Sequence, residues 1–324
     1  MKVYVRAPAR LHLGLIDLGG DLGRLFGGIG VAINQPNVIV EAEKSERFTV
    51  DGEKDELVKP WVDRFLKKYN LEPKVALNVT ETIPQHVGLG SGTQLALATA
   101  AALAKLFKLK ASTQELSIVM GRGVVSGVGT ALFDKGGFVV EGGVKSQNGK
   151  AVTSWGGFPP VVFRSSFPND WFFVVAIPQV KGGLSGEAEA HAFRDLPSMS
   201  PQQADRISRL ILMSLLPALV EKDIGTFGGA LTQIQNLIGD YFASAQGGRF
   251  SSSPSNQCIE YMLSRGAFGA GQSSWGPTVY GLVEGKRQAE KLSLDVGDFL
   301  QKKVGGQVFW TDANNKGAYI KKSE

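Results

Sequence analysis

Residues 83–94, IPQHVGLGSGTQ, run directly into the alanine-rich segment LALATAAALAKLFK. Three glycines within five positions leave the backbone open to a ligand where a helix begins. The first N–H groups of a helix lack partners and lie at the positive end of its macrodipole, so they form a cradle for an anion such as phosphate. An ordinary glycine-rich turn is the alternative. The residues expected at the phosphate are Gly88, Leu89, Gly90, Ser91, Gly92 and Thr93.

Length and composition indicate two globular domains. The chain has 324 residues, 43% hydrophobic and 20% charged, and single cores stop growing at roughly 250–300 residues. The single cysteine, Cys258, excludes an internal disulfide and suits a reducing compartment. The start, MKVYVRAPAR, lacks the apolar core of a signal peptide, and the runs WFFVVAI and LILMSLL are too short to span a bilayer. We therefore expect a cytoplasmic protein with no membrane partner.

The net charge of +5 does not by itself predict nucleic-acid binding. Basic and acidic residues alternate, and no basic patch with interleaved aromatic residues appears. Anionic small-molecule substrates account for the surplus equally well. The lysine-rich end, GAYIKKSE, is expected to be a solvated tail.

Hydrophobic periodicity predicts an α+β chain with an N-terminal domain over residues 1–170 and a C-terminal domain over 171–324. Strand patterns dominate the first 60 residues, beginning with an edge strand. Ser112 and Ser200 each open a helix with a capping pattern. Pro217 should kink or break the second of these helices. Other helices are expected over residues 59–69, 91–109, 226–246, 254–265 and 288–303.

Three segments resemble the GHMP superfamily of small-molecule kinases: APARLHLGLIDLGG, IPQHVGLGSGTQ and GAFGAGQSSWGPTVYGLVEG. The central signature of the superfamily, P-x-x-x-G-L-G-S-S, is matched from Pro84 to Ser91. The resemblance spans nearly the whole chain. It implies a two-domain α+β GHMP-kinase-like fold, with an N-terminal ribosomal-protein-S5-like domain and a C-terminal ferredoxin-like domain.

Two departures from the kinase pattern concern catalysis. Gly92 stands where the kinases have a second serine, whose hydroxyl commonly assists the metal. The kinase segment S-G-x-D carries the catalytic aspartate, but here it reads S-G-V-G and ends in Gly129. Asp134, five residues on, could substitute only if the loop were rebuilt. A phosphate cradle is thus retained while the kinase base is missing.

Further segments, RLHLGLIDL, GLGSGTQ, SGVGTALF and GLSGEAE, resemble the β-ribofuranosylaminobenzene 5′-phosphate synthase subgroup, an archaeal-type family. That resemblance implies condensation of phosphoribosyl pyrophosphate with 4-hydroxybenzoate or 4-aminobenzoate, releasing pyrophosphate and carbon dioxide, in methanopterin biosynthesis. An ATP-dependent GHMP kinase and a non-catalytic GHMP-fold binding protein are the alternatives. The preferred benzoate, residual ATP binding and the subunit assembly stay open, with a homodimer as one expectation.

This reaction needs a group that polarises the hydroxyl or amine of the ring. His12 and Asp17 are the candidates, although an isolated strand histidine or a turn aspartate is often structural. Arg10, counted with the catalytic residues, and Arg24 could clamp a carboxylate or phosphate, because planar guanidinium groups match both. Ser185 and Gly271 complete the expected substrate-binding residues.

The segment GGLSGEAEAHAF is expected to start a helix that carries a metal site. Glu187 and His191 would share one face, with Glu189 pointing elsewhere. Carboxylates here suit Mg²⁺, which takes oxygen ligands and keeps waters and substrate phosphates. A charged, exposed first turn is the alternative. Glu187 and Glu189 are therefore the expected metal ligands, with Mg²⁺ as the divalent cofactor.

Overall fold

The computed structural model describes residues 1–52, 54–123, 125–147, 150–151, 158–184 and 186–323. Its strands are β1 (Lys2–Asp17), β2 (Arg24–Lys44), β3 (Thr49–Gly52), β4 (Val75–Glu81), β5 (Phe138–Glu141), β6 (Val144–Gln147), β7 (Lys150–Ala151), β8 (Val161–Ser165), β9 (Trp171–Pro178), β10 (Gly269–Gln272), β11 (Val279–Glu284), β12 (Gly306–Asp312) and β13 (Tyr319–Ser323). Its helices are α1 (Asp55–Lys68), α2 (Ser91–Leu106), α3 (Thr113–Val119), α4 (Val128–Lys135), α5 (Glu187–Asp195), α6 (Pro201–Leu210), η1 (Ile211–Leu215), α7 (Leu216–Glu221), α8 (Ile224–Gln246), α9 (Ser253–Ser264) and α10 (Lys286–Gln301). The predicted α+β class is confirmed.

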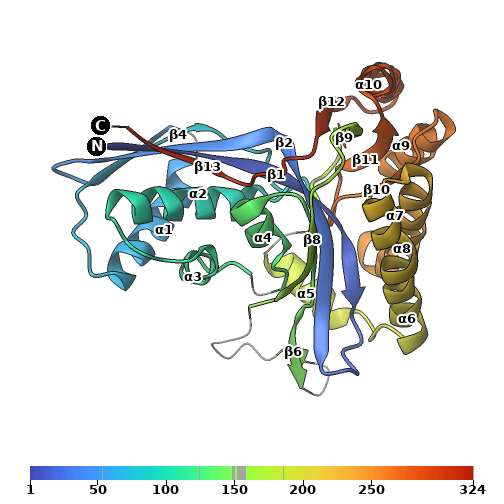
Figure 1. Cartoon of the computed structure of the whole chain (residues 1–324), viewed down its shortest axis with the longest axis horizontal. Coiled ribbons are helices and arrows are strands. Elements are labelled where there is room, and N and C mark those ends of the chain that lie inside the picture. The colour runs from blue at the N-terminus through green and yellow to red at the C-terminus, as the bar shows by residue number, and fades with distance from the viewer. Residues whose placement is uncertain (53, 124, 148–149, 152–157, 185, 324) are drawn as a thin grey trace.

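The first sheet is built on a long antiparallel hairpin of β1 and β2 (Figure 1). Its strand order is β13-β1-β2-β4-β3, and β5 also pairs with β2. Helix α2 packs against both β1 and β2. All but four residues of α2 are buried, because its alanines allow the helix to lie close to the sheet. The start of α2, where the glycine loop ends, is thereby fixed against β1.

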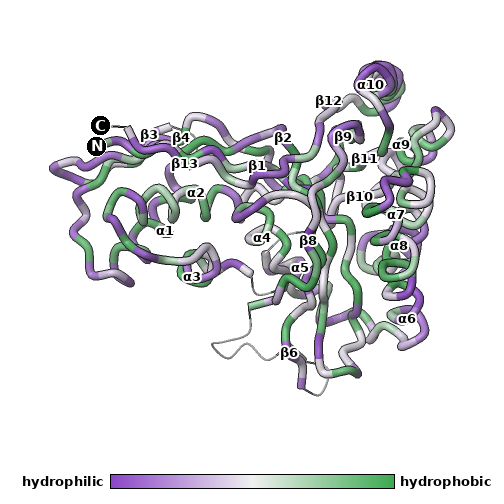
Figure 2. Tube along the Cα trace, in the orientation of Figure 1, coloured by the Kyte–Doolittle hydropathy of each residue, from purple (hydrophilic) through white to green (hydrophobic). Residues whose placement is uncertain are grey.

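The second sheet has the order β10-β11-β9-β12, and all of its strand pairs are antiparallel. Helix α8 packs on β10, and α10 packs on β12 and β9. Figure 2 shows α10, at the outside of this sheet, as largely hydrophilic. Its buried positions, Ala289, Leu292, Val296 and Leu300, recur at helical spacing and face the sheet.

The end of the chain is a strand, so the predicted solvated tail is wrong. β13 pairs antiparallel with β1, from Lys2 opposite Ser323 to Arg6 opposite Tyr319. The rings of Tyr4 and Tyr319 also meet edge to face at 6.4 Å. β1 therefore lies between β13 and β2 and is not an edge strand. The backbone hydrogen bonds of this pairing hold a segment whose side chains are exposed.

Local signals placed several helices correctly. Capping boxes start α3 at Ser112 and α6 at Ser200, as predicted. The predicted irregularity at Pro217 is also confirmed, because the π-helical turn η1 directly precedes the short helix α7. Within the described part of the chain, no helix is both long and apolar enough to cross a membrane.

Candidate active site

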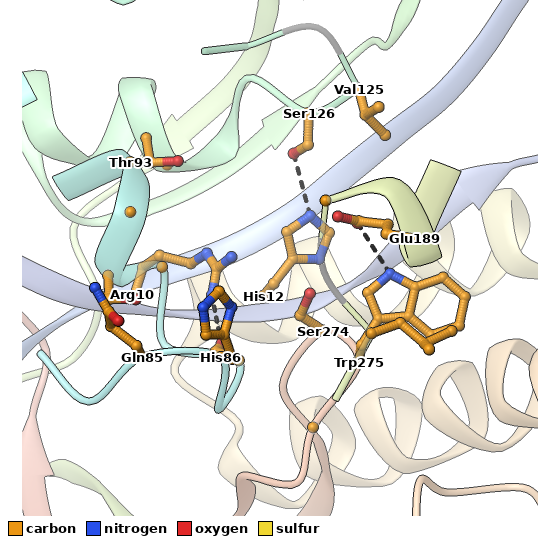
Figure 3. Close-up of a pocket in the computed structure, with 18 of the residues that line it drawn as sticks. Arg10, His12, Gln85, His86, Thr93, Val125, Ser126, Glu189, Ser274 and Trp275 are labelled. Atoms are coloured by element: carbon orange, nitrogen blue, oxygen red, sulfur yellow. Dashed lines mark hydrogen bonds between the residues drawn. The ribbon is translucent and has the colours of Figure 1, made fainter. Parts of the chain in front are cut away.

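A cavity of about 930 Å³ opens between the two sheets at the start of α2. It is bordered by the glycine loop, β1, the loop before α4, α5, α8 and the connection from β10 to β11. In Figure 3, Arg10 and Thr93 lie at one side, His12 and Ser126 in the middle, and Glu189 and Trp275 at the other side. The predicted site residues that line it are Arg10, His12, Gly88, Gly90, Ser91, Gly92, Thr93 and Glu189.

The glycine loop presents backbone to the cavity. Gly88 and Gly90 have φ angles of 94° and 82°, in the left-handed region that favours glycine. The amides of Thr93 and Gln94 make the first intrahelical bonds of α2, both to the Gly90 carbonyl. The amides of Ser91 and Gly92 precede those bonds and lie at the positive end of the helix. Leu89 is instead buried in the core and does not line the cavity.

Arg10 fastens this loop to β1. Its Nη1 donates to the Gly88 carbonyl (2.5 Å), and its backbone amide donates to the Leu89 carbonyl (3.2 Å). A Cβ on Gly90 would lie 3.1 Å from Arg10 Cγ, so the guanidinium stem packs directly on the loop. Burial lowers the pKa of Arg10 to about 10, and the nearby Glu189 carboxylate partly offsets that effect. Arg10 therefore stays cationic at neutral pH beside the helix start.

His12 lies in the middle of the cavity wall and is 7% exposed. Its backbone amide donates to Ser273 Oγ (2.9 Å), and its Nε2 lies 3.1 Å from Ser126 Oγ. Burial and the positive charge of Arg10 lower the pKa of His12 to about 3. The imidazole is therefore neutral at physiological pH, so one of its ring nitrogens is free to accept a hydrogen bond.

Arg122 is a cavity residue that the sequence did not identify. Its guanidinium lies over the Trp61 ring (5.0 Å) and beside Gly92, where a Cβ would be 3.4 Å from Nη2. Burial and the nearby Arg64 lower its pKa. Its Nε has no hydrogen-bond partner in the described part of the chain. The start of α2 is thus flanked by two arginines, Arg10 and Arg122.

An aromatic wall, formed by Phe193, Phe242 and Trp275, closes the opposite side of the cavity. The Trp275 ring meets Phe242 at 4.6 Å and Phe193 at 5.5 Å, both edge to face. Trp275 Nε1 donates to Glu189 Oε1 (2.9 Å). Burial raises the pKa of Glu189, and this hydrogen bond and Arg10 partly offset the rise. The wall gives an aromatic substrate an apolar surface with a carboxyl group at its edge.

Three other predicted residues do not reach the cavity. Asp17 Oδ1 accepts hydrogen bonds from the amides of Gly19 (2.7 Å) and Gly20 (3.0 Å), so it closes the turn after β1. Arg24 donates to two backbone carbonyls in the turn after β5, at 2.5 and 2.6 Å. Gly271 is buried in β10, where a Cβ would lie 2.4 Å from the Gln235 side chain. Each supports the fold around the site.

Of the expected metal ligands, Glu189 faces the cavity, whereas Glu187 is exposed and does not line it. Ser185, also expected here, lies outside the described residues. No group of three His, Cys, Asp or Glu side chains in the described residues could hold a metal unaided. Mg²⁺ often binds one carboxylate together with waters and substrate phosphates, so Glu189 fits as a single ligand.

The kinase base has no replacement at its usual place. Gly129 lies in the first turn of α4, and a Cβ there would contact Thr93 at 3.1 Å. Asp134 is exposed at the far end of α4 and accepts a hydrogen bond from Thr113 Oγ1 (2.9 Å). Asp134 does not line the cavity.

Comparisons with known proteins agree with this geometry. Family models described as GHMP kinases N terminal domain and GHMP kinases C terminal match residues 56–142 and 215–302. A β-ribofuranosylphenol 5′-phosphate synthase of Methanothermobacter thermautotrophicus is 35% identical over 99% of this chain and 99% of its own length. This chain belongs to the same synthase family. The synthase of Archaeoglobus fulgidus is also 35% identical, over 98% of each chain.

Membership of the β-ribofuranosylphenol 5′-phosphate synthase family confirms the predicted subgroup and makes the chain an enzyme of the GHMP superfamily. Homoserine kinase from Cytophaga hutchinsonii has a TM-score of 0.70 at 19% identity, covering 98% of this chain and 97% of the kinase. Galactokinase from Lactococcus lactis has a TM-score of 0.69 at 15% identity, covering 98% and 95%. These likenesses concern the fold, and the predicted GHMP-kinase-like fold is confirmed.

Proposed function

We propose that this synthase-family chain condenses phosphoribosyl pyrophosphate with 4-hydroxybenzoate, forming β-ribofuranosylphenol 5′-phosphate with release of pyrophosphate and carbon dioxide. One observation carries the proposal: a single cavity has a cationic, amide-rich end and an aromatic end, with a neutral histidine between them. The relatives are named for a phenol product, which favours 4-hydroxybenzoate over 4-aminobenzoate. The product would then enter methanopterin biosynthesis.

The pyrophosphate is assigned to the end formed by the glycine loop, Arg10 and Arg122. Departure of pyrophosphate leaves oxocarbenium character on the ribose carbon and concentrates negative charge on the leaving group. Two guanidinium groups and the first amides of α2 stabilise that charge as it develops. The stacking of Arg122 on Trp61 orients its N–H groups before the substrate arrives, which reduces the entropy lost on binding.

The benzoate ring is assigned to the aromatic wall. Phe193, Phe242 and Trp275 provide edges and faces against which a planar ring can pack. His12 accepts a hydrogen bond from the 4-hydroxyl group, which increases electron density on that oxygen and at the ring carbon that bears the carboxylate. That carbon attacks the ribose, and the carboxylate leaves as carbon dioxide. No phosphoryl group is transferred, so a carboxylate at position 129 is not needed.

The test is release of labelled carbon dioxide from carboxyl-labelled 4-hydroxybenzoate. We expect release that depends strictly on phosphoribosyl pyrophosphate and neither requires nor consumes ATP. Stoichiometric ADP formation with a small alcohol, without carbon dioxide release, would restore the kinase alternative. Binding of both substrates without any turnover would favour a non-catalytic protein. Comparing hydroxy- and aminobenzoate in the same assay decides the acceptor.

We further propose that Mg²⁺ assists the departing pyrophosphate and that Glu189 is its ligand from the protein. When bound, the ion would neutralise charge on the pyrophosphate. We expect Glu189→Gln to raise the Mg²⁺ concentration for half-maximal activity by about tenfold or more. Glu187→Gln is the matched control and should leave it unchanged, because Glu187 is exposed outside the cavity. Equal shifts in both variants, or full turnover in excess EDTA, would contradict this assignment.

A further inference from the structure

Glu141 is a buried carboxyl group that does not line the cavity. It ends β5, and none of its surface is exposed. Its Oε2 accepts a hydrogen bond from the Gly143 amide (2.6 Å). Its Oε1 has no hydrogen-bond partner among the described residues. Burying a carboxylate with an unpartnered oxygen is costly, and an amide side chain could hold the Gly143 turn equally well.

The unpartnered oxygen lies directly behind His12. Strand β2 separates β1 from β5, and its Gly28 is paired opposite Glu141. A Cβ on Gly28 would lie 3.0 Å from Glu141 Oε1 and 3.3 Å from His12 Nε2. Because glycine has no side chain, the carboxyl group and the imidazole face each other across this position.

Ser126 joins the two groups. Its Oγ lies 3.1 Å from His12 Nε2 and accepts a hydrogen bond from the Val128 amide (3.3 Å). A hydroxyl oxygen has two lone pairs and one hydrogen. When neutral His12 carries its proton on Nε2, both lone pairs are occupied, and the Ser126 hydrogen remains to be donated. Glu141 Oε1 is an unpartnered acceptor on the far side of Gly28 from the same His12 nitrogen that contacts Ser126. The Ser126 hydroxyl also lowers the pKa of Glu141, as expected of a donor to that carboxyl group.

We propose that Glu141 stores the proton of the acceptor hydroxyl during the reaction, exchanging it with His12 through Ser126. The proposal rests on the proposed function. The phenol O–H bond breaks and its proton binds His12 Nδ1, while Nε2 passes its proton to Ser126 Oγ. The Ser126 hydrogen moves to Glu141 Oε1. Glu141 thus acts as a positioning residue for the proton and does not itself touch the substrate.

The remaining bonds balance without any other reactant. The ring carbon bonds to the ribose carbon as the bond to pyrophosphate breaks and pyrophosphate takes the electron pair. The bond to the carboxylate then breaks, carbon dioxide leaves, and the electron pair returns to the ring as a phenolate. Glu141 returns the proton by the same route. The phenol oxygen thus regains the proton that it lost, so no net proton is needed from water.

The electrostatics around Glu141 suit reversible proton storage. Burial raises the pKa of Glu141 to about 7, and the Gly143 and Gly127 amides, Ser126 and Arg24 partly offset the rise. Among the described residues, the charged or titratable groups that face it are His12 from β1 and Arg24 from β2. Arg164 of β8 turns instead to the carbonyls of α4 and Gly136. A group with this pKa can gain and lose a proton near neutral pH.

The test compares Glu141→Gln with wild type in the carbon dioxide assay. The amide keeps the shape and an oxygen for the Gly143 amide, but it cannot store the proton. At pH 7 we expect kcat to fall roughly 100- to 1000-fold, with KM for phosphoribosyl pyrophosphate within about twofold of wild type. The difference in kcat between Glu141→Gln and wild type should narrow as the pH approaches the pKa of a phenol, about 10, because the acceptor is then already ionised when it binds.

Ser126→Ala provides a second, independent variant. It should show the same loss of kcat as Glu141→Gln. The double variant should be no worse than either single one, because both changes interrupt the same proton relay, from His12 through Ser126 to Glu141. Ser117→Ala is the matched control, since Ser117 Oγ is a buried hydroxyl that contacts Thr130 of α4 (2.8 Å) outside the cavity. Its kcat should be unchanged.

The outcomes separate the relay from the proposed function. No carbon dioxide release by the wild type would overturn the function, and the relay with it. Release by the wild type, combined with additive or pH-independent deficits in the variants, would overturn the relay alone. If Glu141→Gln does not fold, as judged by thermal melting, the pH profile of Ser126→Ala decides.

Discussion

Replacing Arg10 by glutamine should lower kcat/KM for phosphoribosyl pyrophosphate by about two to three orders of magnitude. The guanidinium donates to the Gly88 carbonyl and carries its charge to the start of α2. Glutamine removes the charge at the pyrophosphate end and the guanidinium hydrogen bond to Gly88, while the backbone hydrogen bond to Leu89 remains. It leaves the Glu189 carboxylate without its nearby cation. Steady-state kinetics with each substrate varied in turn would measure the loss.

Arg164→Gln is the matched control for Arg10. Arg164 is also partly buried and also donates to backbone carbonyls, those of Ala131 (2.8 Å) and Gly136 (2.5 Å). It does not line the cavity. We expect a lower melting temperature for this variant with little change in KM for phosphoribosyl pyrophosphate. Equal kinetic losses in the two variants would mean that Arg10 acts only through stability, and the assignment of the pyrophosphate end would fail.

The parts of the site that the sequence predicted correctly are those encoded locally. The glycine loop and the start of α2 lie within a dozen residues of each other in the chain. Closely spaced glycines directly before a helix pattern are therefore enough to predict an anion-binding helix start. The absence of a kinase aspartate at Gly129 is local information of the same kind. Capping boxes at Ser112 and Ser200 follow the same logic.

The partners of His12 could not be predicted from the sequence. Ser126, which contacts His12, and Glu141, which lies across Gly28 from it, are more than 100 residues away in the chain. They come near His12 only because β1, β2 and β5 pair side by side. Arg122 reaches Gly92 only because α3 ends beside α1 and α2. These contacts are products of tertiary packing, and no local pattern marks them.

Asp17 and Arg24 illustrate a different limit. Their residue types suit both a ligand and a turn, and the structure uses them to hold backbone turns. The lysine-rich end of the chain was misjudged for a related reason. Its side chains are those of a solvated tail, but its backbone pairs with β1. Backbone hydrogen bonding does not depend on side-chain hydropathy, so a hydropathy pattern cannot predict this strand.

Gly90→Val should abolish most of the activity, with kcat/KM for phosphoribosyl pyrophosphate reduced at least about 100-fold. Gly90 has a φ of 82°, and a Cβ there would lie 3.1 Å from Arg10 Cγ and 3.3 Å from Nε. A branched side chain must therefore displace the guanidinium, and it also covers the amides at the start of α2. Isothermal titration with phosphoribosyl pyrophosphate measures the loss directly.

Gly247→Val separates this effect from backbone strain. Gly247, at the end of α8, has nearly the same φ and ψ as Gly90 (80° and 17° against 82° and 18°), but a Cβ there would meet nothing within 4 Å. Both variants bear the cost of a β-branched residue in the left-handed region, of order 1–3 kcal/mol. Only Gly90→Val places atoms against Arg10. If both variants bound phosphoribosyl pyrophosphate equally well, the anion would not lie at the glycine loop, and the pyrophosphate would have to be sought elsewhere in the cavity.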